Sequence, residues 1–326
     1  MWPNRPVLVT GATGFVGSHL AERLVAEGAR VRVLVRDPCK LIESLRDRVE
    51  VVTGDLLQPN GFAPATRDID TVFHVAAWLG TPNNVKAAHA INVTATRQLA
   101  EAARSSNVRR FVYTSSIAVY GPVLSGVVDE TWPHWPVYAY GGTKSLGEQA
   151  ALAAHSDRFG VTVIRPAMVY GARGAAWTTL PVKLAQRGLP SLVGGGYGFS
   201  HPVYVENLVD AYLLAAERHE AVGEAFTISD GDVSWREFFG RYAAMAGKRA
   251  RSIPAALAWI GAALAETAAK ITRRPPSISR AQLGFVTGRA QLSTTKAQRL
   301  LGWSPRLSLD EGLRCTEAWL REEKYL

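Results

Sequence analysis

Few residues in this sequence could bind a metal or form a disulfide bond. The 326 residues include two cysteines, Cys39 and Cys315, and no group of His, Cys, Asp and Glu has the spacing of metal ligands. Two cysteines so far apart in the chain provide neither a disulfide framework nor a zinc motif. We therefore expect no metal, and a reducing compartment, the cytoplasm.

Long hydrophobic runs are also absent. No stretch approaches the roughly eighteen uninterrupted apolar residues that a membrane-spanning helix needs. The opening residues "MWPN" lead directly into "PVLVT" without a charged region or a long apolar core, so no signal peptide is expected. Hydrophobic residues make up 47% of the chain and charged residues 20%, which is typical of a globular protein.

Acidic residues are almost absent from residues 241–306. This segment has twelve Lys or Arg residues and one acid, Glu266, so its net charge is +11. The whole chain has a net charge of +9, so the other residues together carry −2. Within it, "IPAALAWIGAALAETAAKI" (253–271) is apolar on most faces and has basic residues on both sides. Three interpretations stay open: a core helix with solvated flanks, the wall of a lipophilic tunnel, and a peripheral helix on an anionic membrane surface.

The basic region also bears on other partners. A positively charged face could hold a substrate carboxylate, coenzyme A or an acyl-carrier protein. The sequence has no nucleic-acid-binding motif, so no nucleic acid is expected as a partner.

Short runs of β-branched residues alternate with helix-length segments through the first half of the chain. The runs are nearly continuous in apolar residues, which is typical of a parallel sheet covered on both faces. We expect strands at 6–10, 31–35, 49–53, 71–75, 110–114 and 161–165, and helices at 15–27, 84–105 and 138–158. This alternation predicts an α/β fold with a doubly wound parallel (Rossmann) sheet.

The pattern changes after residue 166. Loops lengthen, and helix-length segments dominate beyond residue 205. We therefore expect a dinucleotide-binding domain over residues 1–166 and a smaller, mostly helical substrate lobe over residues 167–326. Residues 224–228 are expected to return one strand to the main sheet.

A glycine-rich turn follows the first predicted strand. The stretch "VTGATGFVG" places Gly11, Gly14 and Gly17 at the mouth of the first helix. Glycines at these places permit a tight turn and close approach of the backbone, and the first amides of a helix bind a pyrophosphate. We expect a dinucleotide at this turn, with further contacts from Thr13, Phe15 and Val16.

The tip of the second strand bears on the choice of cofactor. In NAD-binding proteins with this type of sheet, an acidic residue at this position binds the ribose of the cofactor. Here the position is occupied by Val35, and Arg36 and Asp37 follow. An arginine there can pair with a 2′-phosphate and stack on adenine, so we favour NADP(H) over NAD(H), with a solvated loop arginine as the alternative. After the third strand, Asp55 and Leu56 are placed to touch the adenine, although Asp55 is equally suited to cap a helix.

Six motifs with familiar order and spacing cover the chain. They are "GATGFVG" (11–17), "GDL" (54–56), "HVAA" (74–77), "YTSSIAVYG" (113–121), "YGGTK" (140–144) and "RPAMVYG" (165–171). On these motifs the sequence resembles the extended short-chain dehydrogenase/reductases over essentially its whole length. The resemblance implies cofactor contacts from Ala76, Ala77, Pro166 and Val169, and a structural role for Asn92.

The expected chemistry needs a proton moved at the oxygen of the substrate. Tyrosine has an ordinary pKa near 10, and a lysine one helical turn away would lower it and could also hold the nicotinamide ribose. This reasoning predicts Tyr140 as general acid/base and Lys144 as its partner. The family pattern implies that Ser116, with Ser115 as the alternative, donates to the substrate oxygen.

Two glycines between that tyrosine and lysine raise a separate question. Gly141 and Gly142 each cost a helix interior roughly 1 kcal/mol relative to alanine. We expect them to make room for a neighbouring helix, since this family usually dimerises there, or for a bulky substrate. The expected assembly is a homodimer.

The resemblance also favours one branch of substrates. Sugar-nucleotide enzymes of the family usually carry an Arg-Asp pair where this chain has Ser200 and His201, and a later Arg-x-Gly-Asp stretch that is missing here. The C-terminal part resembles the 3β-hydroxysteroid and sterol-carboxylate dehydrogenase branch, which includes β-keto acid reductases. This implies oxidoreduction between a secondary alcohol and a ketone on a lipophilic substrate.

Two alternatives to this function remain. One is a nucleotide-sugar epimerase, reductase or dehydratase with tightly bound NAD(P). The other is a non-catalytic dinucleotide sensor, against which the retained Ser116, Tyr140 and Lys144 argue.

Several other residues are candidates for the substrate side. His201 is expected at the junction of the lobes, where it could touch substrate. Some of the tryptophans at 78, 132, 135 and 177 are expected to wall an apolar pocket, with Trp78 and Trp177 as the candidates for substrate contact, although ordinary packing is the alternative. His74, on the fourth strand, is expected to be a core histidine with its hydrogen bonds satisfied.

Overall fold

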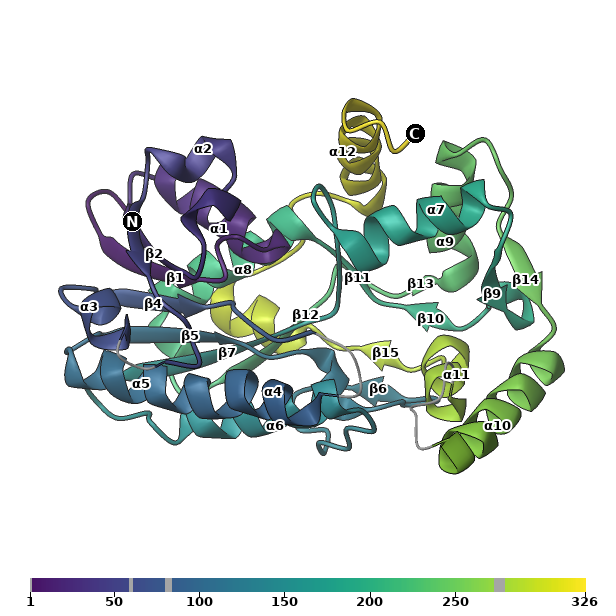
Figure 1. Ribbon diagram of the computed structural model, residues 1–326, viewed down its shortest axis with the longest axis horizontal. Coiled ribbons are helices and arrows are strands. Elements are labelled where there is room, and N and C mark those ends of the chain that lie inside the picture. Colours follow the sequence, from purple (N-terminus) through teal and green to yellow (C-terminus); the bar gives the residue numbers. More distant parts are fainter. Residues whose placement is uncertain (1, 59–60, 80–83, 273–278) are drawn as a thin grey trace.

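A seven-stranded sheet forms the centre of the molecule (Figure 1). The computed structural model describes residues 2–58, 61–79, 84–272 and 279–326. The strand order is β12-β7-β5-β4-β1-β2-β3, and every neighbouring pair is parallel. The strands are β1 (Pro6–Thr10), β2 (Arg30–Val35), β3 (Glu50–Thr53), β4 (Thr71–His74), β5 (Arg110–Thr114), β7 (Gly160–Pro166) and β12 (Ala225–Ile228).

Helices cover both faces of this sheet, and the sequence of β1 shows why. Val7 and Val9 point into one core, while Leu8 points into the other, because side chains alternate along a strand. The first core lies under α1 (Phe15–Ala26) and α8 (Val205–Glu217), and the second under α5 (Thr96–Ser105) and α6 (Ala139–Leu152). A strand buried on both faces has to be apolar throughout, which is the pattern that the sequence shows.

The position of the binding crevice follows from the strand order. From β1 the chain proceeds outward to β2 and β3, and then crosses to β4 on the other side of β1. In such sheets ligands bind beyond the carboxyl ends of the strands, at the point where the order reverses. The turn after β1 and the segment after β4 therefore frame the crevice.

The doubly wound fold predicted from the sequence is confirmed, and the six predicted strands are found within one residue at each end. The segment 224–228 contributes β12, which pairs with β7. Two predicted helices differ from expectation. The first, over residues 84–105, divides into α4 (Val85–His89), a π-helical segment η3 (Ala90–Ala95) and α5. The second, over 138–158, ends at Leu152, because residues 156–159 form a tight turn whose ends bond to each other and lead into β7.

The C-terminal part is mostly helical, as expected, and surrounds several two-stranded pieces of sheet (Figure 1). Its helices are α7 (Leu180–Gln186), α9 (Trp235–Met245), α10 (Ala255–Thr272), α11 (Arg280–Thr287) and α12 (Leu309–Glu322). The strand pairs are β8 (Met168–Tyr170) with β11 (Pro202–Tyr204), β9 (Pro190–Val193) with β14 (Arg251–Ile253), β10 (Phe199–Ser200) with β13 (Val233–Ser234), and β6 (Val127–Val128) with β15 (Gln291–Leu292).

Two short helices complete the first half of the chain, α2 (Glu43–Arg46) and α3 (Phe62–Thr66). Across the part of the chain that the structure describes, no helix combines the length and the apolar character needed to cross a membrane.

Candidate functional site

The glycine turn after β1 has the geometry that its sequence predicts. Gly11 has a φ of +78°, and a Cβ there would lie 2.8 Å from the backbone nitrogen of Ala76. A Cβ on Gly17 would overlap the carbonyl oxygen of Gly11. The turn therefore requires glycine at both positions, because the first has a left-handed backbone and the second sits against the turn itself.

The N-terminal end of α1 is open to an anion. Gly14 is its N-cap and offers no side-chain cap, and the first turn has no acidic residue. Thr13 and Gly14 are exposed, while Phe15 and Val16 are half-buried. The helix is twelve residues long, so its first amides and its dipole favour a phosphate. The residues present thus fit the diphosphate of a dinucleotide.

At the other end of the crevice, the tip of β2 carries Arg36 exposed to solvent. The neighbouring carboxylate of Asp37 accepts a hydrogen bond of 3.1 Å from the backbone of Cys39 and so caps a short 3-10 helix (Pro38–Lys40). Asp55 does not cap a helix, because its carboxylate accepts from the backbone of Leu57 at 2.9 Å within a turn. Leu56 packs, half-buried, against the second core.

The segment after β4 is held in place by Asn92. The backbone of Ala76 donates to the hydroxyl of Thr10 at 3.2 Å. Asn92 accepts from the backbone nitrogen of Trp78 at 2.7 Å and donates to the Trp78 carbonyl at 3.1 Å and to the Thr143 hydroxyl at 3.0 Å. One buried amide therefore ties the crevice loop, which includes Ala77, to helix α6, in agreement with a structural role for Asn92.

His74 is the satisfied core histidine that the sequence predicts. Its two ring nitrogens form hydrogen bonds with the hydroxyls of Thr10 (2.8 Å) and Thr96 (3.0 Å). Complete burial, with a smaller effect from Lys144, lowers the pKa of His74 to about 3. The imidazole is therefore neutral at physiological pH.

Ser116 and Tyr140 meet at the carboxyl end of β5. Ser116 is the N-cap of η4 (Ile117–Tyr120), and its hydroxyl accepts from the backbone of Ala118 at 3.1 Å. The Tyr140 side chain, from the first turn of α6, lies close enough to Ser116 for this residue to lower the pKa of the phenol against the larger effect of burial. Ser115 is buried, and its hydroxyl has no partner among the described residues. The structure therefore places Ser116, and not Ser115, against the phenol.

Lys144 lies one turn further along α6 and is completely buried. Its Nζ is 4.4 Å from the centre of the Tyr113 ring, a cation–π contact. Burial lowers the pKa of Lys144 to about 7, against an opposing effect of Glu148. The ammonium form of Lys144 is therefore less favoured than that of an exposed lysine.

The spacing of Tyr140 and Lys144 along the helix predicts a lowered pKa for Tyr140, whereas in the structure the net direction is the opposite. The pKa of Tyr140 is raised, because burial disfavours the phenolate more than the hydrogen bond with Ser116 favours it. The correction has a physical origin that spacing along a helix does not reveal, namely that the same burial acts on both side chains.

The two glycines of α6 have different surroundings. A Cβ on Gly141 would overlap the carbonyl oxygen of Ala118, so the close neighbour at this position is the η4 segment of the same chain. A Cβ on Gly142 would meet nothing within 4 Å. A third glycine, Gly147, was missed, and a Cβ there would overlap the Asn92 carbonyl and the Tyr113 hydroxyl.

A buried ion pair lies behind Lys144. Glu148, one turn further along α6, accepts from both Nε (3.1 Å) and a terminal nitrogen of Arg165 on β7. The other terminal nitrogen of Arg165 donates to the Tyr120 hydroxyl at 2.9 Å. These bonds fix α6 and η4 to the sheet. The pairing of Glu148 with Arg165 was not identified from the sequence, because an ion pair between distant segments has no local sequence pattern.

A small cavity of about 30 Å³ adjoins η4 on the side of the C-terminal lobe. Its lining is mainly apolar and includes Ile117, Tyr120, Phe199, His201 and Phe285. Among these residues, His201 has its Nδ1 2.7 Å from a carboxylate oxygen of Asp232. Asp232 was not predicted, because it lies 31 residues further along the chain.

The four tryptophans named from the sequence do not line this cavity. Within the described residues, the cavity lining contains no tryptophan. Trp177 packs on Trp235, with ring centres 5.6 Å apart, in the core of the C-terminal lobe. Trp132 packs beside η4, Trp135 is 73% exposed, and Trp78 is half-buried in the crevice loop. The aromatic wall consists instead of Tyr120, Phe199 and Phe285.

The remaining predicted cofactor residues lie at the carboxyl end of the sheet. Pro166 ends β7 and Val169 lies half-buried in β8, both next to the strand ends that frame the crevice. The described residues contain no group of three or more His, Cys, Asp or Glu side chains that could hold a metal ion.

A doubly wound parallel sheet with a glycine turn at the start of its first helix is the fold of dinucleotide-dependent oxidoreductases. The model of the NAD dependent epimerase/dehydratase family matches residues 7–229. The chain belongs to this family, and the extended short-chain dehydrogenase/reductase assignment is confirmed.

Individual relatives match over nearly the whole length. The chain is 30% identical to a 4-hydroxy-2-methyl-3-oxo-4-farnesyl-3,4-dihydroquinoline-1-oxide ketoreductase of Stigmatella aurantiaca (94% of this chain, 93% of the relative). It is 27% identical to the decarboxylating sterol-4-alpha-carboxylate 3-dehydrogenase of Mus musculus (94% and 89%) and 28% identical to a 2-alkyl-3-oxoalkanoate reductase of Stenotrophomonas maltophilia (96% and 98%). These matches confirm the branch that the C-terminal part predicts.

Among solved structures, the complex of MoeE5 with UDP-glucose and NAD is similar. It has a TM-score of 0.78 and 27% identity, with 98% of this chain and 99% of that chain covered.

Proposed function

We propose that this protein is an NADP(H)-dependent oxidoreductase that interconverts a secondary alcohol and a ketone on a lipophilic substrate of the hydroxysteroid or 3-oxo acid class. The observation that carries the proposal is the placement of Ser116, Tyr140 and Lys144 together at the carboxyl end of β5, where α6 packs against η4 with the Gly141 backbone next to the Ala118 carbonyl. Residues 1–166 would hold most of the cofactor and residues 167–326 most of the substrate.

Each side chain has a distinct role in this proposal. A bound nicotinamide supplies or accepts the hydride. Tyr140 donates a proton to the substrate oxygen in reduction and accepts it in oxidation, and its raised pKa keeps the phenol in the donating form. The Ser116 hydroxyl orients the same oxygen, and Lys144 holds the nicotinamide ribose.

The lining of the cavity beside η4 is mainly apolar, which favours a lipophilic substrate, and the cavity itself, about 30 Å³, has room for only a small part of such a molecule. His201, whose Nδ1 lies 2.7 Å from a carboxylate oxygen of Asp232, adds an imidazole ring to this lining. The ring can form a hydrogen bond with a polar group at the end of an apolar molecule. The names of two relatives, the sterol-4-alpha-carboxylate 3-dehydrogenase and the 2-alkyl-3-oxoalkanoate reductase, describe substrates of this kind.

Chemistry on a nucleotide-sugar is the second candidate, because the similar structure MoeE5 binds UDP-glucose and NAD. An epimerase would regenerate its bound cofactor and show no net turnover of it. The two candidates therefore differ in a simple optical signal.

The test is an absorbance assay with NADPH and, separately, NADH. The substrates are 2-alkyl-3-oxo acids, 3-oxosteroids, their alcohols with the oxidised cofactors, and UDP-glucose. We expect steady oxidation of NADPH with an oxo acid or oxosteroid. Turnover of UDP-glucose without a change in cofactor absorbance would replace this proposal with the sugar-nucleotide alternative.

A further inference from the structure

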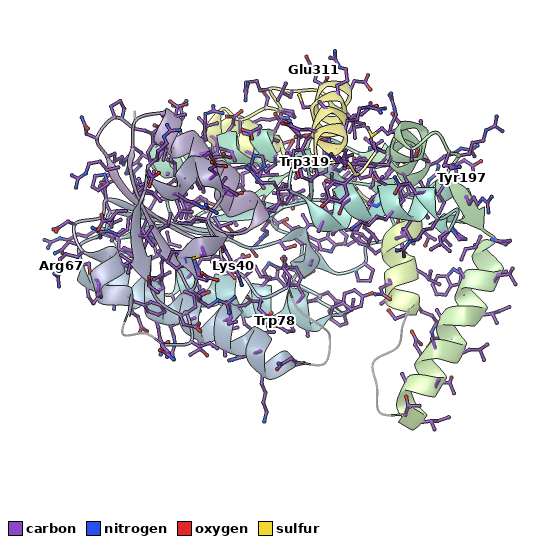
Figure 2. All side chains as sticks on the ribbon, turned by 45° about the horizontal axis from the view of Figure 1, so that its top comes forward. Lys40, Arg67, Trp78, Tyr197, Glu311 and Trp319 are labelled. Carbon is purple, nitrogen blue, oxygen red and sulfur yellow. The ribbon has the colours of Figure 1, made fainter. Side chains whose placement is uncertain are left out.

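The apolar segment noted in the sequence forms a helix that is largely uncovered. Helix α10 lies at the edge of the C-terminal lobe, beside α11 (Figure 1), and its side chains extend away from the body of the molecule (Figure 2). The core-helix interpretation is therefore wrong. Contact with the rest of the protein is limited to a narrow stripe, in which Ala258 and Ala262 pack against Leu283 of α11.

The opposite face of α10 exposes large apolar side chains. The exposed fractions are 62% for Leu257, 58% for Ile260, 66% for Leu264 and 78% for Ile271. The spacings of three, four and seven residues place these four side chains on one face of the helix. Trp259, 39% exposed, lies on another side of the helix, about 100° around its axis from Ile260. We call the set Leu257, Ile260, Leu264 and Ile271 the α10 face.

The charges around the α10 face have one sign. Lys248, Arg249 and Arg251 directly precede α10 and are exposed. The acid within the helix, Glu266, accepts from both the backbone and the side chain of Arg280, at 2.7 and 2.8 Å. The surface therefore combines an apolar helical face with positively charged side chains, and the carboxylate of Glu266 is paired with Arg280.

We propose that the α10 face docks the protein onto an anionic lipid bilayer surface, with the helix lying in the plane of the interface. Apolar side chains of this size bury into the acyl boundary, while flanking Lys and Arg contact anionic headgroups. A second copy of this chain is a poorer occupant, because two such regions, each with a net charge of +11 over residues 241–306, would repel each other. An acidic soluble carrier would leave the apolar side chains uncovered.

The docked surface is connected to the cavity beside η4. Two adjacent residues of α11 make the link, since Val286 packs with the α10 helix and Phe285 lines the cavity. The α10 face is therefore separated from the cavity by α11 alone, and docking would bring the cavity near the bilayer surface. That a substrate from the bilayer binds there rests on the proposed function, whereas the docking does not.

The test is co-sedimentation of the full chain with vesicles of phosphatidylcholine, alone or with phosphatidylglycerol. We expect binding to the anionic vesicles and much weaker binding to the neutral ones. The triple variant Leu257→Ser, Ile260→Ser, Leu264→Ser should bind at least tenfold more weakly. Lys248→Gln with Arg249→Gln should lose about fivefold for each cation removed, since each contributes about 1 kcal/mol near such a surface.

The matched control is Leu180→Ser, which removes a similarly exposed leucine from α7. It should bind vesicles as the native chain does, and thermal unfolding should show that all variants remain folded. Equal binding of the native chain and the triple variant would overturn the proposal. So would a native dimer, measured by light scattering without lipid, that the triple variant converts to a monomer. Because no substrate is present, failure of the ketone assay would leave the docking result standing.

Discussion

Gly141 lies so close to Ala118 that a single methyl group on the glycine would overlap the Ala118 carbonyl oxygen. Ala118 belongs to η4, and the preceding residue of α6 is Tyr140. Close packing of α6 on η4 is therefore what brings the Tyr140 phenol to the Ser116 hydroxyl.

The two adjacent glycines should respond in opposite ways to the same change. Gly141→Ala should lower the free energy of unfolding by about 1–3 kcal/mol, because the new methyl overpacks the contact with η4, and should lower kcat. Gly142→Ala, with open space around it, should raise the free energy of unfolding by up to about 1 kcal/mol through helix propensity. Denaturant unfolding and steady-state kinetics measure both. A stable, fully active Gly141→Ala enzyme would refute the packing argument.

The phenol of Tyr140 should be needed for chemistry but not for folding. Tyr140→Phe should lower kcat by about 10²–10⁴-fold, the usual contribution of a positioned acid or base, while cofactor binding by fluorescence stays within a few-fold. The control is Tyr138→Phe, two residues earlier, whose hydroxyl is exposed and 3.3 Å from the Ser279 hydroxyl. Full activity in the Tyr140 variant would remove Tyr140 from the mechanism.

Arg36 should determine the preference for NADP(H). Arg36→Ala should raise KM for NADPH about tenfold or more and leave KM for NADH almost unchanged, since the lost partner is the 2′-phosphate. Arg30→Ala is the matched control, because Arg30 is also exposed but lies at the other end of β2. Equal losses with both cofactors would show that Arg36 does not read the phosphate.

Stability should depend on pH through Lys144. Its pKa falls from an ordinary 10.5 to about 7 in the folded protein, so between these values the unfolded chain binds the extra proton. The free energy of unfolding should therefore rise with pH from about 7, by at most about 1.4 kcal/mol per pH unit from this group. Lys144→Met should remove this rise between about pH 7 and 9.5, measured by denaturant titration, whereas exposed Lys86→Met should keep it. An unchanged slope in the Lys144 variant would contradict the assignment.

The sequence predicts those parts of the fold and site that depend on neighbours in the chain. The strands, the glycine turn with Gly11 and Gly17, and the Tyr140–Lys144 spacing all have local patterns. Contacts between distant segments have none. For this reason the Ala118 carbonyl at Gly141 and the Asp232 partner of His201 were not foreseen.

Burial was the second source of error. The apolar composition of the α10 segment is also typical of a core helix. The exposed fractions of its side chains in the folded protein show that one face is uncovered. For the same reason the direction of the Tyr140 pKa could not be obtained from spacing, since it depends on how deeply the side chain sits.

The π-helical segment η3 (Ala90–Ala95) affects which insertions and deletions this protein can accept. Because a π-helical turn holds one residue more than an α-helical turn, a single deletion within residues 90–95 would convert it to regular helix. Because the removed residue is the extra one of this turn, α4 and α5 would keep nearly the same orientation about the helix axis, whereas residues inside the turn, Asn92 among them, would shift relative to the Trp78 backbone. A single deletion here should therefore preserve the helix on both sides and remove the link between Asn92 and the crevice loop, whereas a deletion within α5 would turn one side of the helix relative to the other.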